Sequence, residues 1–105
     1  ALPAPSPLPV VQELKARLIA ADIAGALAQI HPLQRNLFSQ VYSDRASHLP
    51  SDGAAMGSFT TDWLREDRAI VRVQHTLIEN GAPVIFESPI ELLRAEDGTW
   101  QVYDY

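Results

Sequence analysis

The chain contains no cysteine, a single lysine and no long apolar run. Without cysteine it cannot be a disulfide scaffold, a cysteine zinc ribbon or an enzyme with a thiol nucleophile. No apolar segment approaches the roughly 20 residues that a membrane-spanning helix needs, so we expect no membrane span. The sequence also lacks a phosphate-binding glycine loop, a nucleophile elbow and the histidine spacings of common metal sites. We therefore expect no metal and no cofactor.

What remains is the composition of one ordinary globular domain. The 105 residues are 47% hydrophobic and 20% charged, which suffices for one core but not for two domains. The net charge of −5 is unevenly spread: residues 1–50 hold three acids and four bases, whereas residues 51–105 hold ten acids and four bases. An acidic chain without a basic stripe is not expected to bind nucleic acid or an anionic membrane surface.

Prolines are concentrated at the start of the chain, at positions 3, 5, 7 and 9. Each proline fixes its own φ and pushes the preceding residue toward extended geometry, which predicts a polyproline-like segment without helix. We interpret residues 1–9 as a leader or linker, and residues 10–105 as a single domain. A ligand for an aromatic-groove domain is the alternative interpretation of the prolines.

The pattern after the prolines is helical. Val11, Leu14 and Leu18 recur at spacings of three and four, and Asp22 is placed to cap a second helix. In a third helix, Leu33, Leu37 and Val41 are expected to be buried, with Phe38 and Tyr42 beside them. The predicted helices are residues 9–20, 23–30 and 32–46.

The second half of the chain changes to the alternating period of strands. Residues 47–57 are polar and carry Pro50 and Gly53, which predicts a loop. Asn80 and Gly81 form the strongest hairpin signal in the chain. The predicted strands are residues 58–64, 71–77, 84–94 and 99–105. Helices followed by strands predict an α+β fold, with N-terminal helices packed on one face of a curved four-stranded antiparallel meander.

Two segments resemble motifs of the nuclear transport factor 2-like superfamily. The run from Leu18 to Leu27 is similar to the first-helix signature, with small residues and Asp22 before an Ala-Leu pair. The ending from Glu96 to Val102 is similar to the closing hairpin, a turn followed by Trp-x-Val. The resemblance covers residues 10–105 and implies a cone, a bent sheet wrapped around a long helix. Members include isomerases, dehydratases, cyclases and many non-catalytic domains of bacterial secreted proteins, and this short form is most similar to the last group.

Two polar residues interrupt apolar strand faces and are the only catalytic candidates. His75 shares a predicted face with Val71 and Val73, and Asp104 shares one with Trp100. If both point into the cone, they could act as an acid/base pair on a small apolar metabolite. A histidine packed in the core is the alternative. The residues expected to line a pocket are Tyr42, Phe59, Trp63, His75, Phe86 and Trp100.

These observations favour a non-catalytic domain that binds a ligand or assembles with other proteins, in a bacterial secreted or envelope protein. The alternative is a small isomerase, cyclase or dehydratase that uses His75 and Asp104. The expected partners are a small apolar ligand, a protein or a second copy, the last through an outer sheet face that carries Tyr103 and Tyr105. Seven arginines against one lysine suggest a bacterial source, and the proline-rich start suggests a secreted or periplasmic location, with a cytoplasmic one left open.

Overall fold

Helices occupy the first half of the chain and strands the second, as the change of period predicts. The computed structural model describes residues 4–105. The helical elements are α1 (Leu8–Ile19), α2 (Ile23–Leu27), η1 (Pro32–Gln34), α3 (Arg35–Asp44), η2 (Ala46–His48) and α4 (Leu49–Ala55). The strands are β1 (Met56–Leu64), β2 (Arg68–Glu79), β3 (Ala82–Arg94) and β4 (Trp100–Asp104). This order confirms the predicted α+β class.

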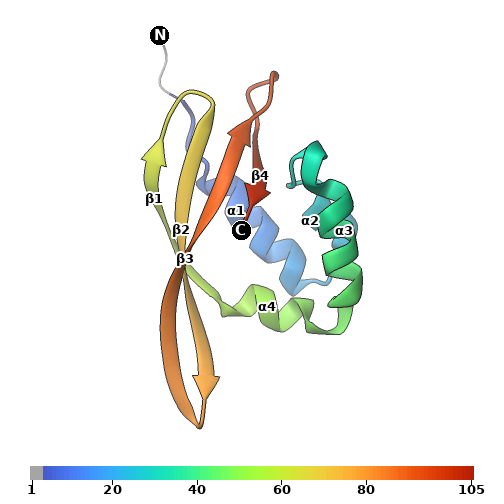
Figure 1. The fold of residues 1–105 in the computed structure, drawn as a ribbon, viewed down its shortest axis with the longest axis vertical. Coiled ribbons are helices and arrows are strands. Elements are labelled where there is room, and N and C mark those ends of the chain that lie inside the picture. The colour runs from blue at the N-terminus through green and yellow to red at the C-terminus, as the bar shows by residue number, and fades with distance from the viewer. Residues whose placement is uncertain (1–3) are drawn as a thin grey trace.

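The four strands form one antiparallel sheet in the order β1-β2-β3-β4, so each strand pairs with its neighbour in the sequence (Figure 1). Asn80 and Gly81 both have positive φ, 52° and 78°, and make the predicted tight turn between β2 and β3. Gly98, with φ of 90°, closes the turn before β4. The meander topology predicted from the turn residues is therefore confirmed.

The core lies between α1 and one face of the sheet. Val11, Leu14 and Leu18 are buried because their spacing places them on one side of α1. The strands meet them with alternating buried residues, which are Ala69, Val71, Val73, Ile90, Leu92, Trp100 and Val102. No helix among residues 4–105 is both long enough and apolar enough to span a membrane.

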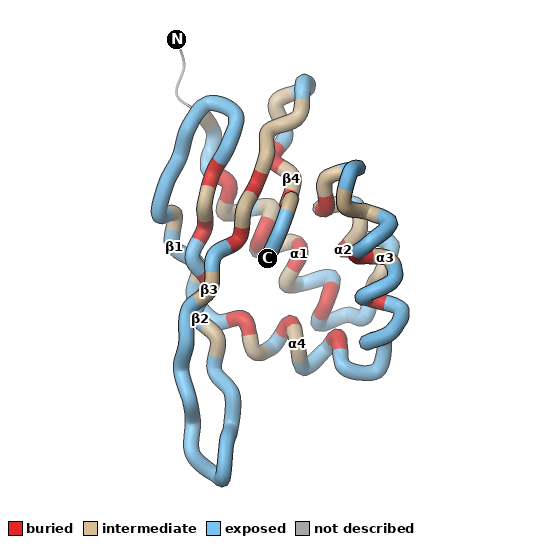
Figure 2. The backbone as a smooth tube through the Cα atoms, viewed as in Figure 1, coloured by how far each residue is buried: buried red, intermediate tan, exposed pale blue. Residues whose placement is uncertain are grey.

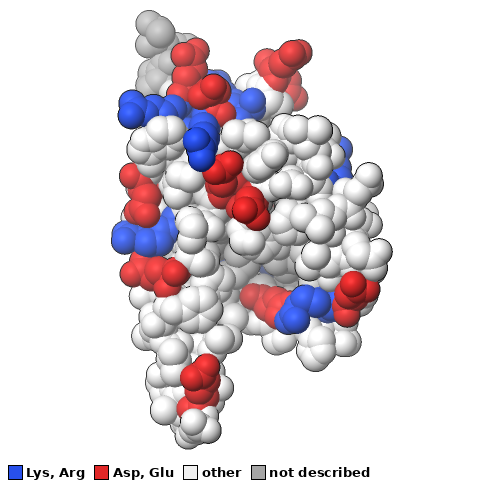
Figure 3. All heavy atoms as spheres, viewed as in Figure 1, with Lys and Arg blue, Asp and Glu red and all other residues white. Residues whose placement is uncertain are grey.

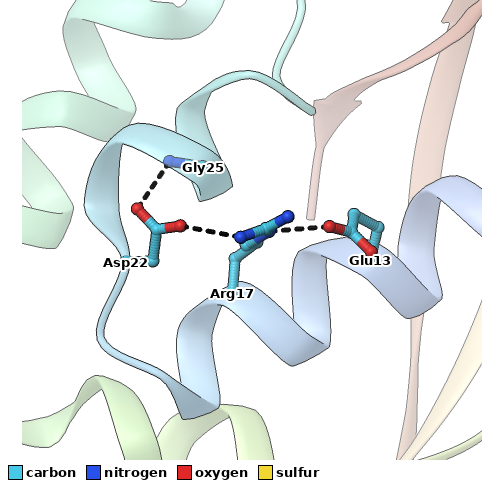
Figure 4. A network of polar contacts seen from close by, with 4 residues as sticks. All are labelled: Glu13, Arg17, Asp22 and Gly25. Carbon is cyan, nitrogen blue, oxygen red and sulfur yellow. Dashed lines mark hydrogen bonds and ion pairs between the residues drawn. The ribbon is translucent and has the colours of Figure 1, made fainter.

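A polar network holds the junction of α1 and α2 (Figure 4). Ala21 has φ of 54°, which turns the chain, and Asp22 caps α2 by accepting a hydrogen bond from the Gly25 N–H at 2.9 Å. Arg17 donates to Asp22 at 3.1 Å and to Glu13 at 2.6 Å. The predicted break between the first two helices is therefore confirmed: Ala21 turns the chain, and Asp22 caps the start of α2.

The second helix ends earlier than predicted, at Leu27 rather than residue 30. Gln29 and His31 exchange backbone hydrogen bonds with Val102 of β4, each 2.7 Å long. The backbone around Ile30 therefore pairs with the sheet edge instead of continuing the helix.

The helix predicted from residue 9 begins one residue earlier, at Leu8, so the prediction of a segment without helix is wrong at its end. A proline in the first turn of a helix loses no hydrogen bond, because the first N–H groups have no partner within the helix. Pro7 is fully buried, and the indole N–H of Trp100 donates to the Pro5 carbonyl at 2.8 Å. The described part of this segment thus belongs to the packed body. The interpretation of residues 1–9 as a leader or linker, separate from a domain of residues 10–105, stays a prediction. Residues 1–3 lie outside the described part.

The predicted loop 47–57 is wrong, because this segment forms η2 and α4. Pro50 lies in the first turn of α4, where it is tolerated. Gly53 faces α1 so closely that a Cβ built on it would lie 2.9 Å from the backbone nitrogen of Ile19. The absence of a side chain at Gly53 therefore lets two helix backbones approach each other.

The third helix buries a different face from the one predicted. Phe38 and Tyr42 are buried, whereas Leu33, Leu37 and Val41 are exposed by 77%, 58% and 37%. The two sets are neighbouring stripes at helical spacing, so periodicity cannot choose between them. The aromatic rings face inward because they bury more apolar area per residue.

The β2–β3 hairpin extends beyond the rest of the sheet. β1 pairs with β2 only as far as His75, and β4 pairs with β3 only at residues 91–94. Residues 76–87, here called the arm, therefore form a two-stranded ribbon and are all exposed (Figures 1 and 2). The radius of gyration is 14.1 Å, compared with about 13 Å expected for a compact chain of this length.

We expect Gly53→Ala to destabilise the protein by about 1–3 kcal/mol, because the added methyl group meets the Ile19 backbone. Helix propensity alone predicts the opposite, a gain of about 1 kcal/mol. Urea unfolding measures the difference. The matched control is Ala54→Gly at the exposed neighbouring position, which reports the propensity effect alone. A Gly53→Ala variant as stable as the parent would contradict the close packing of α1 and α4.

Candidate functional site

A pocket of about 300 Å³ lies between the inner face of the sheet, α3 and α4. Leu18, Leu49 and Met56 form buried parts of its wall, each exposed by only 2%. The C-terminal Tyr105 and the start of the arm complete it. The full lining consists of Leu18, Phe38, Val41, Tyr42, Arg45, Leu49, Asp52, Ala55, Met56, His75, Leu77 and Tyr105.

Two tyrosines join α3 to the end of the chain at this pocket. The hydroxyl groups of Tyr42 and Tyr105 are hydrogen-bonded at 2.5 Å, and the Tyr105 ring is stacked on Phe38 with centroids 5.2 Å apart. Burial raises the pKa of Tyr105 to about 12 and raises that of Tyr42 above its usual range. Both hydroxyls are therefore neutral hydrogen-bonding groups at physiological pH.

An ion pair contributes the charged side chains of the lining. Arg45 donates two hydrogen bonds to Asp52, at 2.8 Å from Nε and 2.6 Å from Nη2. The guanidinium group lowers the pKa of the Asp52 carboxyl, which keeps the carboxylate charged. Since the two charges cancel, the pair gives the pocket no net charge of either sign.

His75 faces the pocket from β2, where the arm begins. Its Nε2 is 2.7 Å from the Ser88 hydroxyl, and its ring is stacked on Phe86 with centroids 4.8 Å apart. Burial lowers the pKa of the imidazole, which favours the neutral ring. His75 is therefore a partly covered polar group with one nitrogen engaged.

The structure does not bring the two catalytic candidates together. Leu92 pairs with Val102, but Glu91 pairs with Asp104, so Tyr103 is an extra residue in β4. This bulge reverses the alternation, and Asp104 joins Glu91 on the outer face while His75 stays on the inner face with Val73. The prediction that Asp104 shares the face of Trp100 and Val102 is wrong.

The same bulge turns Tyr105 inward, where it lines the pocket. The prediction that Tyr105 lies on the outer sheet face is therefore also wrong. The outer face instead carries ion pairs, with Arg72 bonded to Glu87 at 2.8 Å and Arg68 bonded to Glu91 at 2.6 Å. Tyr103 packs edge-on against His31, with centroids 5.6 Å apart.

Of the six residues predicted to line a pocket, Tyr42 and His75 do so. Trp100 is in the core, and Phe59 packs against the edge of that core. Trp63 is 37% exposed at the sheet edge, beneath the guanidinium groups of Arg65 and Arg68. Phe86 lies on the arm and covers His75.

Sequence reasoning missed the part of the pocket that α4 builds, because the segment was read as a loop. Leu49, Asp52 and Ala55 of α4 line the pocket, together with Met56, the first residue of β1. A signal was present: Leu49, Gly53 and Met56 recur at spacings of four and three, as on one side of a helix. Among residues 4–105, no three histidine or acidic side chains are grouped closely enough to hold a metal ion.

No family model matches the chain, and no curated protein is similar enough to it to be a relative. The resemblance to the nuclear transport factor 2-like superfamily therefore stays a prediction.

We expect the pKa of His75 to be lower in the folded protein than in the unfolded chain. As the pH falls through the ordinary histidine pKa of about 6.5, the unfolded chain takes up the proton first. The His75 contribution to stability is therefore complete above that pH and is lost as the pH falls toward the folded-state pKa. Titration of the ring signals by NMR, in buffer and in concentrated urea, compares the two states.

The matched variant is Phe86→Ala, which uncovers the ring and should raise the folded-state pKa of His75. A folded-state value at or above the value in urea would contradict the burial of His75.

Proposed function

We propose that this chain is a non-catalytic domain that binds a small, neutral, apolar ligand in the pocket between the sheet, α3 and α4. The observation that carries the proposal is the combination of an apolar wall with polar lining groups that are already paired with one another. Pockets for small molecules are concave, mostly apolar and equipped with a few placed polar groups.

The wall favours an apolar ligand of modest size. Leu18, Leu49 and Met56 offer buried aliphatic surface, and Phe38 and Leu77 add to it from opposite sides. The volume of about 300 Å³ is at the lower end of the range of ligand pockets, roughly 300–1,000 Å³. This favours a compact body of one or two rings, or a short branched chain.

The polar groups favour a ligand without charge. Arg45 and Asp52 neutralise each other, so a charged ligand would have to break that pair to gain one partner. Tyr42 and Tyr105 share a hydrogen bond, and neutral His75 is bonded to Ser88. In the described residues, His75 Nδ1 has no hydrogen-bond partner, so one hydroxyl or carbonyl group on the ligand could be accommodated there.

The catalytic alternative has less support. An isomerase or dehydratase of the predicted kind needs a carboxylate beside His75, and the bulge in β4 places Asp104 on the other face of the sheet. Asp52 does line the pocket, but its oxygens accept from Arg45. A general base must be available to accept a proton from the substrate, and a carboxylate already paired with an arginine is not. Such a pair instead stabilises the shape of the pocket.

The family and the location remain parts of the proposal. The order of elements, with capped helices before a curved meander, is compatible with a nuclear transport factor 2-like cone. The low lysine content and the proline-rich start support a bacterial secreted or periplasmic protein. A homodimer through the outer sheet face has little support, since that face is occupied by ion pairs.

The single methionine of the chain, Met56, lies in the pocket wall and makes a direct test simple. Protein labelled with ¹³C at the methionine methyl group gives one signal, which is followed by NMR during titration with 2-naphthol. We expect a saturable shift with a dissociation constant of roughly 0.05–1 mM, as is typical for a compact ligand of this size.

The matched variants lie on α3. Val41→Trp fills the mouth of the pocket and should weaken binding at least about tenfold, whereas Ser43→Trp, at an exposed position outside the lining, should leave it unchanged. Binding that survives Val41→Trp would place the naphthol elsewhere. If neither naphthol, indole nor cyclohexanol shifts the Met56 signal, the proposed function is wrong.

A further inference from the structure

The two hydrogen-bonded tyrosines of the pocket, here called the tyrosine pair, carry one more hydroxyl hydrogen than their mutual bond uses. The hydroxyl groups of Tyr42 and Tyr105 are 2.5 Å apart. Each hydroxyl has one hydrogen, so whichever tyrosine donates, the hydrogen of the other is not used by this bond. Within residues 4–105, neither hydroxyl group makes a second hydrogen bond. The tyrosine pair therefore offers one O–H donor.

This donor is held in a fixed position at the pocket. Both tyrosines belong to the lining, and Tyr42 is exposed by only 2%. The ring of Tyr105 is stacked on Phe38, with centroids 5.2 Å apart and an interplanar angle of 1°. Rings that are held by packing also hold their hydroxyl groups in place, so the donor is preorganised for a ligand.

The protein leaves the acceptor for this hydrogen to the ligand. Burial raises the pKa of Tyr105, and the Asp52 carboxylate in the same lining adds to this effect. Both oxygens of Asp52 nevertheless accept from Arg45, and no hydrogen bond joins Asp52 to the tyrosine pair in the described residues. His75 also lines the pocket, and its Nε2 is engaged with the Ser88 hydroxyl.

A ligand that covers the tyrosine pair has to satisfy this donor. An O–H group that is buried without an acceptor costs free energy, whereas an oxygen with an unused lone pair is tolerated better. The tyrosine that accepts from its neighbour is also the stronger donor, because successive hydrogen bonds polarise one another. The tyrosine pair therefore favours a ligand that brings an acceptor over a hydrocarbon of the same shape.

The charges of the lining favour a neutral acceptor over a carboxylate. Arg45 is the single arginine or lysine in the lining that the described residues form, and it is bonded to Asp52. Figure 3 shows few charged atoms on the surface between the sheet and α3, apart from a group of both signs at the level of α4. A carboxylate would lose its hydration there without gaining a free cation. A carbonyl oxygen is neutral and has no hydrogen of its own that needs a partner.

We propose that the tyrosine pair determines the specificity of the pocket and selects small apolar ligands that carry a neutral carbonyl group, such as cyclic ketones and lactones. The carbonyl oxygen accepts the remaining hydroxyl hydrogen, while the hydrocarbon part packs on Leu18, Leu49 and Met56. This inference rests on the proposed function, because it concerns the same pocket.

The test uses two probes of nearly the same shape, 1-indanone and indane, which differ by one carbonyl group. Their dissociation constants are measured from the ¹³C methyl signal of Met56. The two probes differ in hydration, so the informative quantity is the change that a variant causes in each of them. A single Tyr→Phe substitution leaves one hydroxyl hydrogen at the pocket, and the decisive variant is therefore the combination of Tyr42→Phe and Tyr105→Phe.

We expect the double variant to weaken binding of 1-indanone about three- to tenfold, which is what the loss of one hydrogen bond causes. Its affinity for indane should be unchanged or higher. The infrared carbonyl band of bound 1-indanone should lie at lower frequency in the parent than in the double variant. Both partners of the bond are replaced by apolar rings of the same shape, so the fold should persist, which circular dichroism checks.

The matched control is Tyr103→Phe, since Tyr103 packs on His31 outside the pocket lining. This variant should bind both probes as the parent does. A third probe, indane-1-carboxylate, should bind more weakly than 1-indanone, and tighter binding would contradict the choice of a neutral acceptor.

The results separate this inference from the proposed function. If the double variant changes the affinity for both probes equally, or leaves the carbonyl band of bound 1-indanone where it is in the parent, the role of the tyrosine pair is wrong and the pocket still binds. If neither 1-indanone nor indane shifts the Met56 signal of the parent, the inference and the proposed function are both wrong.

Discussion

The packing of α1 against the inner face of the sheet is the contact on which the rest of the structure depends. Val11, Leu14 and Leu18 supply one continuous apolar stripe, and the alternating residues of three strands supply the surface that receives it. Once α1 is in place, Gly53 allows α4 to approach it closely. The pocket is the space that remains between α4, α3 and the part of the sheet that α1 does not reach.

The polar groups of the pocket are arranged to stabilise its shape. The Tyr42 and Tyr105 hydroxyls, the Arg45–Asp52 pair and His75 with Ser88 each connect different segments of the chain. Breaking such a bond in a partly buried setting costs free energy, because it leaves a polar group that has neither water nor a protein partner. Because the polar lining groups are already hydrogen-bonded to one another, the pocket needs little reorganisation when an apolar ligand enters.

The sequence by itself determined the order of helices and strands, the hairpin turn at Asn80 and Gly81, and the buried stripe of α1, because these follow from local periodicity and turn chemistry. It placed Tyr42 and His75 at the pocket, but it could not choose the inward face of α3, where two neighbouring stripes compete for burial. Only the tertiary structure decided that choice, the helix around Gly53 and the orientation of the last residues of β4. One extra residue in that strand sends Asp104 outward and Tyr105 inward, because side chains alternate and the register depends on a partner strand.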